Sequence, residues 1–276
     1  MVLHADNVGR IWDAGEPSWT STDAILYALG VGAGTAELAF TTESPVQLTL
    51  PTFPVVLNGH RGGNLADRIG DFDHAKLLHG EQSISLHSAI PPAGTARAIA
   101  ELEGLHDKGR DALVRLKSSL VDASSGTLLA DVRTGLFIRG AGGFGGSRGE
   151  SVSWQQPDRS PDHVVRYETS PDQALLYRLS GDRNPLHSDP AYAARAGFDR
   201  PILHGLCTYG FTGRALLHAV CGSDPKRFGA MSARFSRPVL PGQELIVSIW
   251  SGSDVLFRTS TADGTVVLDR GRFRLR

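Results

Sequence analysis

The segment 179–187, Leu-Ser-Gly-Asp-Arg-Asn-Pro-Leu-His, contains side chains that could carry out acid–base chemistry. Asp182 and His187 stand five residues apart, with Pro185 between them. Because proline prevents a regular helix, we expect a loop that turns the carboxylate and the imidazole toward one small volume. Such a pair can hold a water molecule, remove one of its protons and deliver another proton nearby. Asn184 could hold the water or the carboxylate in place.

Other interpretations of this segment must be weighed. Asp and Asn side chains also cap local backbone groups, so the segment could be a structural turn. Ligand-type side chains for a metal occur at Asp182, His187, Asp189 and His204. Their spacing matches no zinc pattern, and the two cysteines are poorly placed to join them. A serine nucleophile is not indicated, since the chain lacks a Gly-x-Ser-x-Gly elbow.

A second element that could take part in catalysis begins at Gly205. An apolar run follows it to about Cys221, and Gly222 is a typical helix stop. In the first turn of such a helix a backbone N–H is free and the helix dipole favours negative charge. That donor could bind a thioester oxygen and stabilise it as an enolate. By itself the position could equally be a helix start with a small residue for packing, and the nearby Asp/His pair favours the chemical role.

The elements that must position these groups occur twice, at an offset of 150 residues (20 against 170). The segments 20–30 and 170–180 resemble each other, and each opens on a capping-box pattern, with Pro171 expected at the first helical position of the second copy. The copies then differ in their polar residues. Opposite the Asp, Asn and His of the second copy, the first has Gly32, Gly34 and Glu37. We therefore expect a duplicated scaffold with one working site and one that has lost its catalytic groups, and this asymmetry favours catalysis over a structural turn at 179–187.

Each half continues with an apolar helical stretch, from about Leu50 and from Gly205, and then with alternating strand-like runs. The runs cover 95–105, 112–120 and 135–139 in the first half, and 243–250, 255–261 and 271–275 in the second. A helix followed by successive strands predicts an α+β fold with antiparallel sheets rather than βαβ units.

Between the halves, the Gly-rich stretch 140–149 and the polar stretch up to about residue 170 predict a loop and a linker. The Gly-rich stretch lacks the Lys-Ser/Thr ending of a phosphate loop, although Arg148 could meet a ligand phosphate. The insertion 61–78 could shape a pocket in the first half.

Composition narrows the class of protein. The 276 residues carry a net charge of −1 without a basic tract, which argues against nucleic acid as a partner. Cys207 and Cys221 lie in one apolar stretch and are expected to be buried thiols rather than a disulfide framework. We expect no signal peptide, no membrane span and no Ser-Lys-Leu peroxisomal ending, and hence a cytoplasmic protein.

The stretch 177–187 followed by His204-Gly205 resembles the signature of the MaoC-like, R-specific enoyl-CoA hydratase 2 family, the 3-hydroxyacyl-thioester dehydratases. Further stretches that look like the two-repeat type of that family are 78–82, 107–109, 142–146 and 233–235. The resemblance covers nearly the whole chain. It implies a double hot-dog fold, in which each repeat wraps an antiparallel sheet around a long helix. The expected division is a non-catalytic, acyl-chain-binding repeat at 1–149, a linker at 150–169 and a catalytic repeat at 170–276.

The resemblance also implies roles for individual residues. Asp182 and His187 would form the catalytic dyad, Asn184 would support it, and Gly205 would bind the thioester oxygen. The residues implied to contact acyl-CoA are His79, Gly80, Lys108 and Phe235. Arg183, beside the dyad, joins these substrate-binding candidates because it could alter the local charge.

The implied reaction is the reversible addition of water to trans-2-enoyl-CoA, giving (3R)-3-hydroxyacyl-CoA in fatty-acid or sterol side-chain metabolism. It needs no metal and no redox cofactor. The alternatives are a dehydratase acting on acyl carrier protein, a hot-dog acyl-CoA thioesterase and a non-catalytic acyl-CoA binding module. A homodimer is expected, because paired repeats still leave sheet faces or edges to cover.

Overall fold

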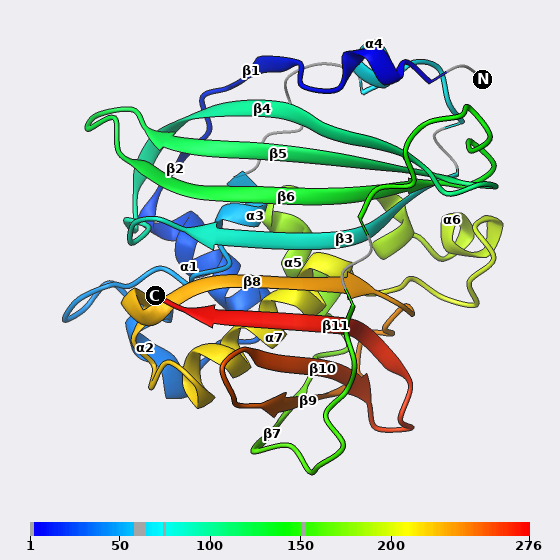
Figure 1. The fold of residues 1–276 in the computed structure, drawn as a ribbon. Helices are drawn as coiled ribbons and strands as arrows, with labels where there is room; N and C mark the ends of the chain where they lie inside the picture. The colour runs from blue at the N-terminus through cyan, green and yellow to red at the C-terminus, as the bar shows by residue number, and fades with distance from the viewer. Residues whose placement is uncertain (1–2, 58–64, 74–75, 151–152) are drawn as a thin grey trace.

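The described part of the chain forms one antiparallel sheet of eleven strands, with helices gathered on one of its faces (Figure 1). The computed structural model describes residues 3–57, 65–73, 76–150 and 153–276. Along the sheet the strands follow the order β1-β4-β5-β6-β3-β8-β11-β10-β9-β7, and β2 pairs with β4. The predicted α+β architecture with antiparallel sheets is thus confirmed.

The two halves of the chain contribute neighbouring parts of this sheet. The first half provides β1 Ile11–Gly15, β2 Ser18–Trp19, β3 Leu77–Leu86, β4 Gly94–Asp107, β5 Ala112–Asp122 and β6 Leu128–Ile138. The second half provides β7 His163–Glu168, β8 Phe228–Phe235, β9 Glu244–Trp250, β10 Val255–Thr261 and β11 Val266–Leu275. The halves meet where β3 pairs with β8, with Glu81 opposite Arg234.

Within the described ranges, the helical segments are short apart from α1 and α7. They are η1 Ala5–Asn7, α1 Ser21–Gly30, η2 Thr35–Glu37, α2 Leu38–Thr41, α3 Pro54–Leu57, α4 Ala66–Ile69, α5 Gln173–Tyr177, η4 Arg178–Ser180, η5 Pro185–His187, α6 Pro190–Arg195, α7 Gly205–Ala219 and η6 Pro225–Arg227. The long helix α7 is buried through most of its length and packs against strands of the second half. None of the described helices combines the length and the apolar character needed to cross a bilayer.

The repeated helix starts differ in detail. Thr20 and Asp23 form the predicted capping box of α1. In the second copy the helix begins only at Gln173, after Asp172, so the prediction that Pro171 occupies the first helical position was wrong. Residues 170–173 first form a turn, in which the Gln173 N–H donates to the Ser170 carbonyl oxygen at 3.0 Å, and the Ser170 N–H donates to Gln173 Oε1 at 3.3 Å as one half of the predicted capping box. The Gln173 amide also donates to the Gly30 carbonyl oxygen at 2.7 Å, which ties α5 to the end of α1.

The predicted long helix is present in the second half as α7, whereas the first half shows only the four residues of α3 before residues 58–64, which lie outside the described part. The insertion 61–78 also lies partly outside the described residues.

The predicted linker 150–169 contains a strand, β7, which pairs with β9 at the edge of the sheet. An edge strand that is largely exposed carries little apolar alternation, so its sequence resembles a loop. The order is also not helix-first, since β1 and β2 precede α1 and β7 precedes α5.

The core beneath the sheet joins both halves. Tyr27, Tyr177 and Tyr209 are fully buried in one apolar cluster with residues of α1, α5 and α7. Contact between α1 and α7 is close: a Cβ added to Gly210 would lie 2.4 Å from Val31 Cγ1. Glycine is therefore required there for the two helices to approach. Both cysteines are free and buried, as expected.

Candidate active site

The loop after η4 holds its shape through the turn chemistry that its sequence predicts. The Asn184 N–H donates to Asp182 Oδ1 at 3.1 Å, and Asn184 Oδ1 accepts from Leu186 N at 3.0 Å as the cap of η5. Asn184 thus holds the carboxylate through its backbone, while its side-chain oxygen caps the next turn. The turn and the chemical interpretations of this segment are compatible, because the turn fixes the position of the Asp182 carboxylate.

His187 is buried at the end of η5 and has a defined hydrogen-bonded orientation. Its Nδ1 lies 2.8 Å from the Ile202 carbonyl oxygen, so Nδ1 carries the proton and donates it. Nε2 is then the nitrogen that can accept a proton. Burial lowers the pKa of His187 from 6.5, against the opposing effects of the Ile202 bond and of Asp182. The neutral imidazole is therefore available as a base.

His204, which the sequence analysis named only as a ligand-type side chain and as part of the family signature, also belongs to this site. Its ring stacks on that of His187 with centroids 3.7 Å apart and planes inclined by 26°. Its Nε2 lies 3.2 Å from the Asp182 carbonyl oxygen, and the Tyr177 ring lies 4.9 Å away on another side. Burial, followed by the neighbouring His187, lowers the pKa of His204 to about 4, so it stays neutral. The signal for it was its place directly before Gly205.

The metal alternative can be compared with this geometry. Ligand atoms of Asp182, His187 and His204 lie within 4.8 Å of one another, close enough for these three to share an ion. Asp189 does not join them, since its carboxylate caps α6 by accepting from Ala191 N at 2.8 Å. One nitrogen of each imidazole, His187 Nδ1 and His204 Nε2, already lies at hydrogen-bond distance from a backbone carbonyl oxygen, at 2.8 and 3.2 Å. The arrangement therefore favours proton transfer over coordination.

Gly205 begins α7, as predicted, and His204 is its N-cap residue. The first-turn N–H groups of a helix lack intrahelical partners, so this end offers donors that could bind a negatively charged oxygen beside the dyad. A Cβ added to Gly205 would lie 3.1 Å from Phe235 Cε1, a tight contact. The Phe235 ring in turn meets the His79 ring edge-on at 4.8 Å. The structure thus brings three predicted residues from β3, β8 and α7 together.

Other predicted residues lie elsewhere. At Gly80 a Cβ would come within 2.3 Å of Phe137 Cδ2, so glycine at this position makes room for that ring. Arg183 is exposed beside the dyad. Its role and that of Gly80 in substrate binding remain predictions.

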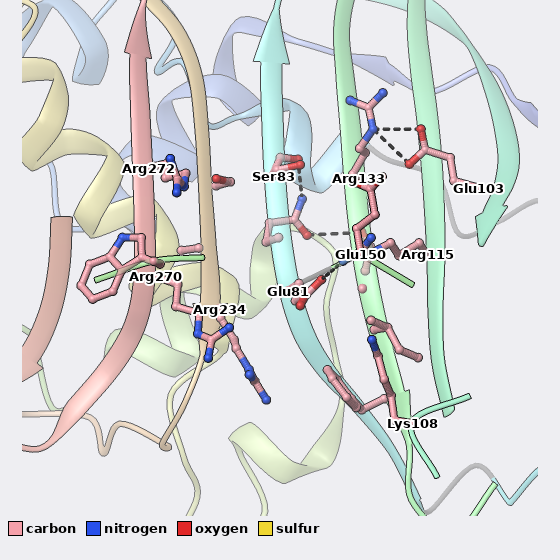
Figure 2. A pocket seen from close by; sticks show the side chains of 18 of the residues that line it. Glu81, Ser83, Glu103, Lys108, Arg115, Arg133, Glu150, Arg234, Arg270 and Arg272 are labelled. Atoms are coloured by element: carbon pink, nitrogen blue, oxygen red, sulfur yellow. Dashed lines mark hydrogen bonds and ion pairs between the residues drawn. The ribbon is translucent and has the colours of Figure 1, made fainter. Parts of the chain in front are cut away.

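Lys108 belongs to a second feature, a groove of about 700 Å³ that crosses both halves of the sheet. Figure 2 shows the lining side chains in front of the sheet, with the helices behind it. Lys108 Nζ donates to the Arg148 carbonyl oxygen, and burial, followed by the nearby Arg115, lowers the Lys108 pKa. The Gly-rich loop is held by Asp107, which accepts from the N–H groups of Gly109, Gly143 and Gly145.

The first half has other side chains at the positions that correspond to the Asp182/His187 dyad. The turn η2, Thr35–Glu37, stands 150 residues before η5, Pro185–His187, so Glu37 occupies the position of His187 (187 − 150 = 37). Its carboxylate binds the Arg214 guanidinium and accepts from His218 Nε2 at 2.6 Å, both on α7. The predicted loss of catalytic groups in this copy fits this arrangement, in which an ion pair anchors the helix.

Family models match the two halves separately. The model described as MFE-2 hydratase 2 N-terminal domain matches residues 18–140, and the one described as MaoC like domain matches residues 153–270. Among curated proteins, the chain is 45% identical to 3-hydroxyacyl-thioester dehydratase Y of Mycobacterium tuberculosis over 98% of both chains. It is 40% identical to an enoyl-CoA hydratase of the same organism over 92% of both chains.

Solved structures agree with these matches. A MaoC-like dehydratase from Phytophthora capsici is similar with a TM-score of 0.92 and 33% identity, over 99% of this chain and 98% of that one. A Mycobacterium tuberculosis protein with a double hot-dog fold is similar with a TM-score of 0.59 and 16% identity, over 97% of this chain and 96% of that one. The latter likeness concerns the fold alone, and together they confirm the predicted double hot-dog architecture.

Proposed function

Because the chain belongs to the MaoC-like family, in the two-repeat form with a hydratase 2 N-terminal domain, we propose that it is an R-specific enoyl-CoA hydratase. The reaction is the reversible addition of water to a trans-2-enoyl-CoA, a hydro-lyase activity of fatty-acid metabolism. The observation that carries this proposal is the buried, neutral His187, whose Nε2 is free beside Asp182 at the start of α7.

The site residues divide the chemistry as follows. Asp182 and His187 Nε2 hold the water between them and remove one of its protons as its oxygen attacks C3. The dyad returns that proton to C2, so one water is consumed and both its hydrogens remain in the product. The Gly205 N–H binds the thioester oxygen, which carries negative charge as the enolate forms. The reverse sequence eliminates water from the 3-hydroxyacyl thioester.

The test is hydration of crotonyl-CoA, followed by loss of the absorbance of the conjugated thioester. We expect Asp182→Asn and His187→Ala each to lower kcat by about 10²–10⁴, the usual contribution of acid–base catalysis. Asp199→Asn, an exposed carboxylate elsewhere, is the matched control and should leave turnover unchanged. Chiral chromatography should find the (3R) product. Folded dyad variants that keep near-wild-type turnover would contradict the assignment, as would an (S) product.

Several finer properties belong to the same proposal. The enzyme works without a metal or redox cofactor, so dialysis against a chelator should leave turnover intact. The first repeat binds the acyl chain. The edge strands β1 and β7 expose Ile11 (63%) and Val164 (50%), which supports a homodimer that light scattering can test. We place the enzyme in the cytoplasm, which cell fractionation can check.

A dehydratase acting on carrier-protein thioesters is the second candidate. The name of the relative that is 45% identical specifies a thioester and not its carrier. The same dyad would serve either substrate, so the distinction depends on what binds the far end of the thioester.

A further inference from the structure

The hydroxyl of Tyr177 is buried without a hydrogen-bond partner. The side chain is 1% exposed, and none of the described residues lies at hydrogen-bond distance from its Oη. Native proteins leave few buried polar atoms in this condition, because an unmade hydrogen bond costs the full desolvation of the group. Ser180 Oγ and His204 Nδ1 are buried and unpartnered in the same way. Such atoms therefore lie on both sides of the loop that carries Asp182, in the segment before it and at the start of α7.

The first repeat has the same tyrosine with a partner. Tyr27 precedes Tyr177 by the repeat offset (177 − 150 = 27), and the two rings lie 6.2 Å apart in the shared core. Tyr27 Oη donates to Thr52 Oγ1 at 3.0 Å. Thr52 stands in the turn that opens the helical stretch of the first half, whereas Gly205 opens α7 and has no side-chain hydroxyl. Of the two tyrosines, the unpartnered one thus belongs to the repeat that carries the dyad.

Tyr177 lies against the start of α7. Its ring is 4.9 Å from the ring of His204, which is the N-cap residue of α7 and stacks on His187. Gly30 at the end of α1 also contacts the ring, since a Cβ added there would lie 3.5 Å from Tyr177 Cδ2. These contacts hold the tyrosine at the helix end that offers the Gly205 N–H.

The protonation state of this hydroxyl limits what it can do. Burial, followed by the nearby Tyr27, Cys207 and Asp182, raises the pKa of Tyr177 well above 10. The hydroxyl therefore keeps its proton at neutral pH and serves as a donor rather than as a base. A donor held in a dry environment stabilises a negatively charged oxygen more strongly than a donor in water does. In the proposed reaction, the thioester oxygen gains such a charge as the enolate forms.

We propose that Tyr177 Oη donates a second hydrogen bond to the thioester oxygen, beside the Gly205 N–H, and is a catalytic residue of the hydratase. The bond forms to the bound substrate and strengthens as water attacks C3 and the oxygen becomes an enolate. Tyr177 keeps its proton throughout, so the proton that Asp182 and His187 return to C2 is still the one taken from water. The proposal rests on the proposed hydratase function and adds a residue to its site.

The test compares Tyr177→Phe with Tyr27→Phe, which removes the same hydroxyl at the matched position of the first repeat. We expect Tyr177→Phe to lower kcat for crotonyl-CoA by about 10²–10³, the effect of removing one oxyanion donor, with little change in KM. Tyr27→Phe should keep the wild-type kcat, because its hydroxyl binds Thr52. A wild-type kcat in Tyr177→Phe would overturn the proposal.

Urea denaturation separates this role from a structural one. Tyr27→Phe removes a buried hydrogen bond and leaves Thr52 Oγ1 without its donor, so its midpoint should fall below that of the wild type. Tyr177→Phe removes a hydroxyl that has no partner among the described residues, so its midpoint should stay at the wild-type value or rise. A Tyr177→Phe protein that fails to fold, or loses turnover together with a lower midpoint, would show a structural role and contradict the proposal.

Infrared spectroscopy of bound butyryl-CoA gives a readout that does not depend on turnover, since this saturated thioester has no double bond to hydrate. A hydrogen bond to the carbonyl oxygen weakens the C=O bond. The band of an isotope-labelled carbonyl should therefore move to lower frequency on binding to the wild type and to Tyr27→Phe, and Tyr177→Phe should lose part of that shift. An equal shift in all three proteins would overturn the proposal. If the wild type hydrates no enoyl thioester, the hydratase assignment fails, and the band still decides whether Tyr177 contacts the thioester oxygen.

Discussion

Replacing Glu37 by Gln should strongly destabilise the protein, although this residue lies in the repeat without the dyad. The Glu37 side chain is only 11% exposed, and the side chain of its partner Arg214 is 4% exposed. Glutamine preserves the shape of the side chain and removes its charge. Arg214 would then be a buried cation without a compensating anion, beside the Val31 carbonyl oxygen and the rings of Tyr167 and Phe211, whose centroids lie 4.5 and 5.6 Å away.

Two arguments give similar values for the free energy of unfolding that is lost with the Glu37 charge. Burial by itself raises the pKa of Glu37, but hydrogen bonds from His218 and Arg214 outweigh it and lower the pKa from 4.5 to about 2. That difference corresponds to about 3 kcal/mol, or roughly 2 kcal/mol after solvent screening of the partly accessible carboxylate. Removing one partner of a buried ion pair costs about 3–5 kcal/mol. We therefore expect Glu37→Gln to lower the free energy of unfolding at pH 7 by about 2–4 kcal/mol.

The pH dependence gives a second signature. A carboxylate whose pKa is lower in the folded state contributes its full stability above pH 4.5, and that stability is lost as the pH falls toward about 2. The difference between wild type and Glu37→Gln should therefore shrink over this window.

The assay is urea denaturation followed by circular dichroism, at pH 7 and through the acid range. Glu168→Gln, an exposed glutamate of β7, is the control and should change stability by less than about 0.5 kcal/mol. Arg214→Met in the Glu37→Gln background should recover part of the loss, because the unpaired charge is then gone. A loss below 1 kcal/mol at pH 7, or a difference that does not depend on pH, would refute the reasoning.

The dyad and the helix packing give three further expectations. Because burial lowers the pKa of His187, kcat/KM for hydration should fall in acid with a midpoint below pH 6.5, and a midpoint above 7 would contradict this. His204→Phe keeps the stack but loses the bond to the Asp182 carbonyl oxygen, whereas His204→Gln keeps a donor and loses the stack; each should lower kcat by about 10–100-fold. Wild-type turnover in both would show that neither contact matters. Gly210→Ala places a Cβ 2.4 Å from Val31 Cγ1 and should cost about 1–3 kcal/mol in urea denaturation, so unchanged stability would mean that α1 and α7 part easily.

The sequence predicted much of this protein because the relevant signals are local. Alternation of apolar residues located most strands, and the hydroxyl-first pattern located α1 through Thr20. The 150-residue repeat is confirmed in detail by η2 and η5, which begin at Thr35 and Pro185. The predictions failed where the signal was weak or tertiary. The exposed edge strand β7 lacks a clear alternation, and α5 starts late because residues 170–173 first form a turn closed by the Gln173 N–H and the Ser170 carbonyl oxygen.

The sequence by itself determined the chemical groups of the site, since Asp182, His187 and Gly205 lie within one short stretch whose turn and helix start are fixed by neighbouring residues. Only the tertiary structure decided how those groups are set. A hydrogen bond between His187 Nδ1 and the Ile202 carbonyl oxygen leaves Nε2 of His187 free to accept a proton, and the fold stacks the His204 ring on the His187 ring. The physical reason is distance along the chain: Glu37 and Arg214 are 177 residues apart, and the groove cations come from both halves. Such pairings depend on how the strands and helices pack, so local sequence patterns do not predict them.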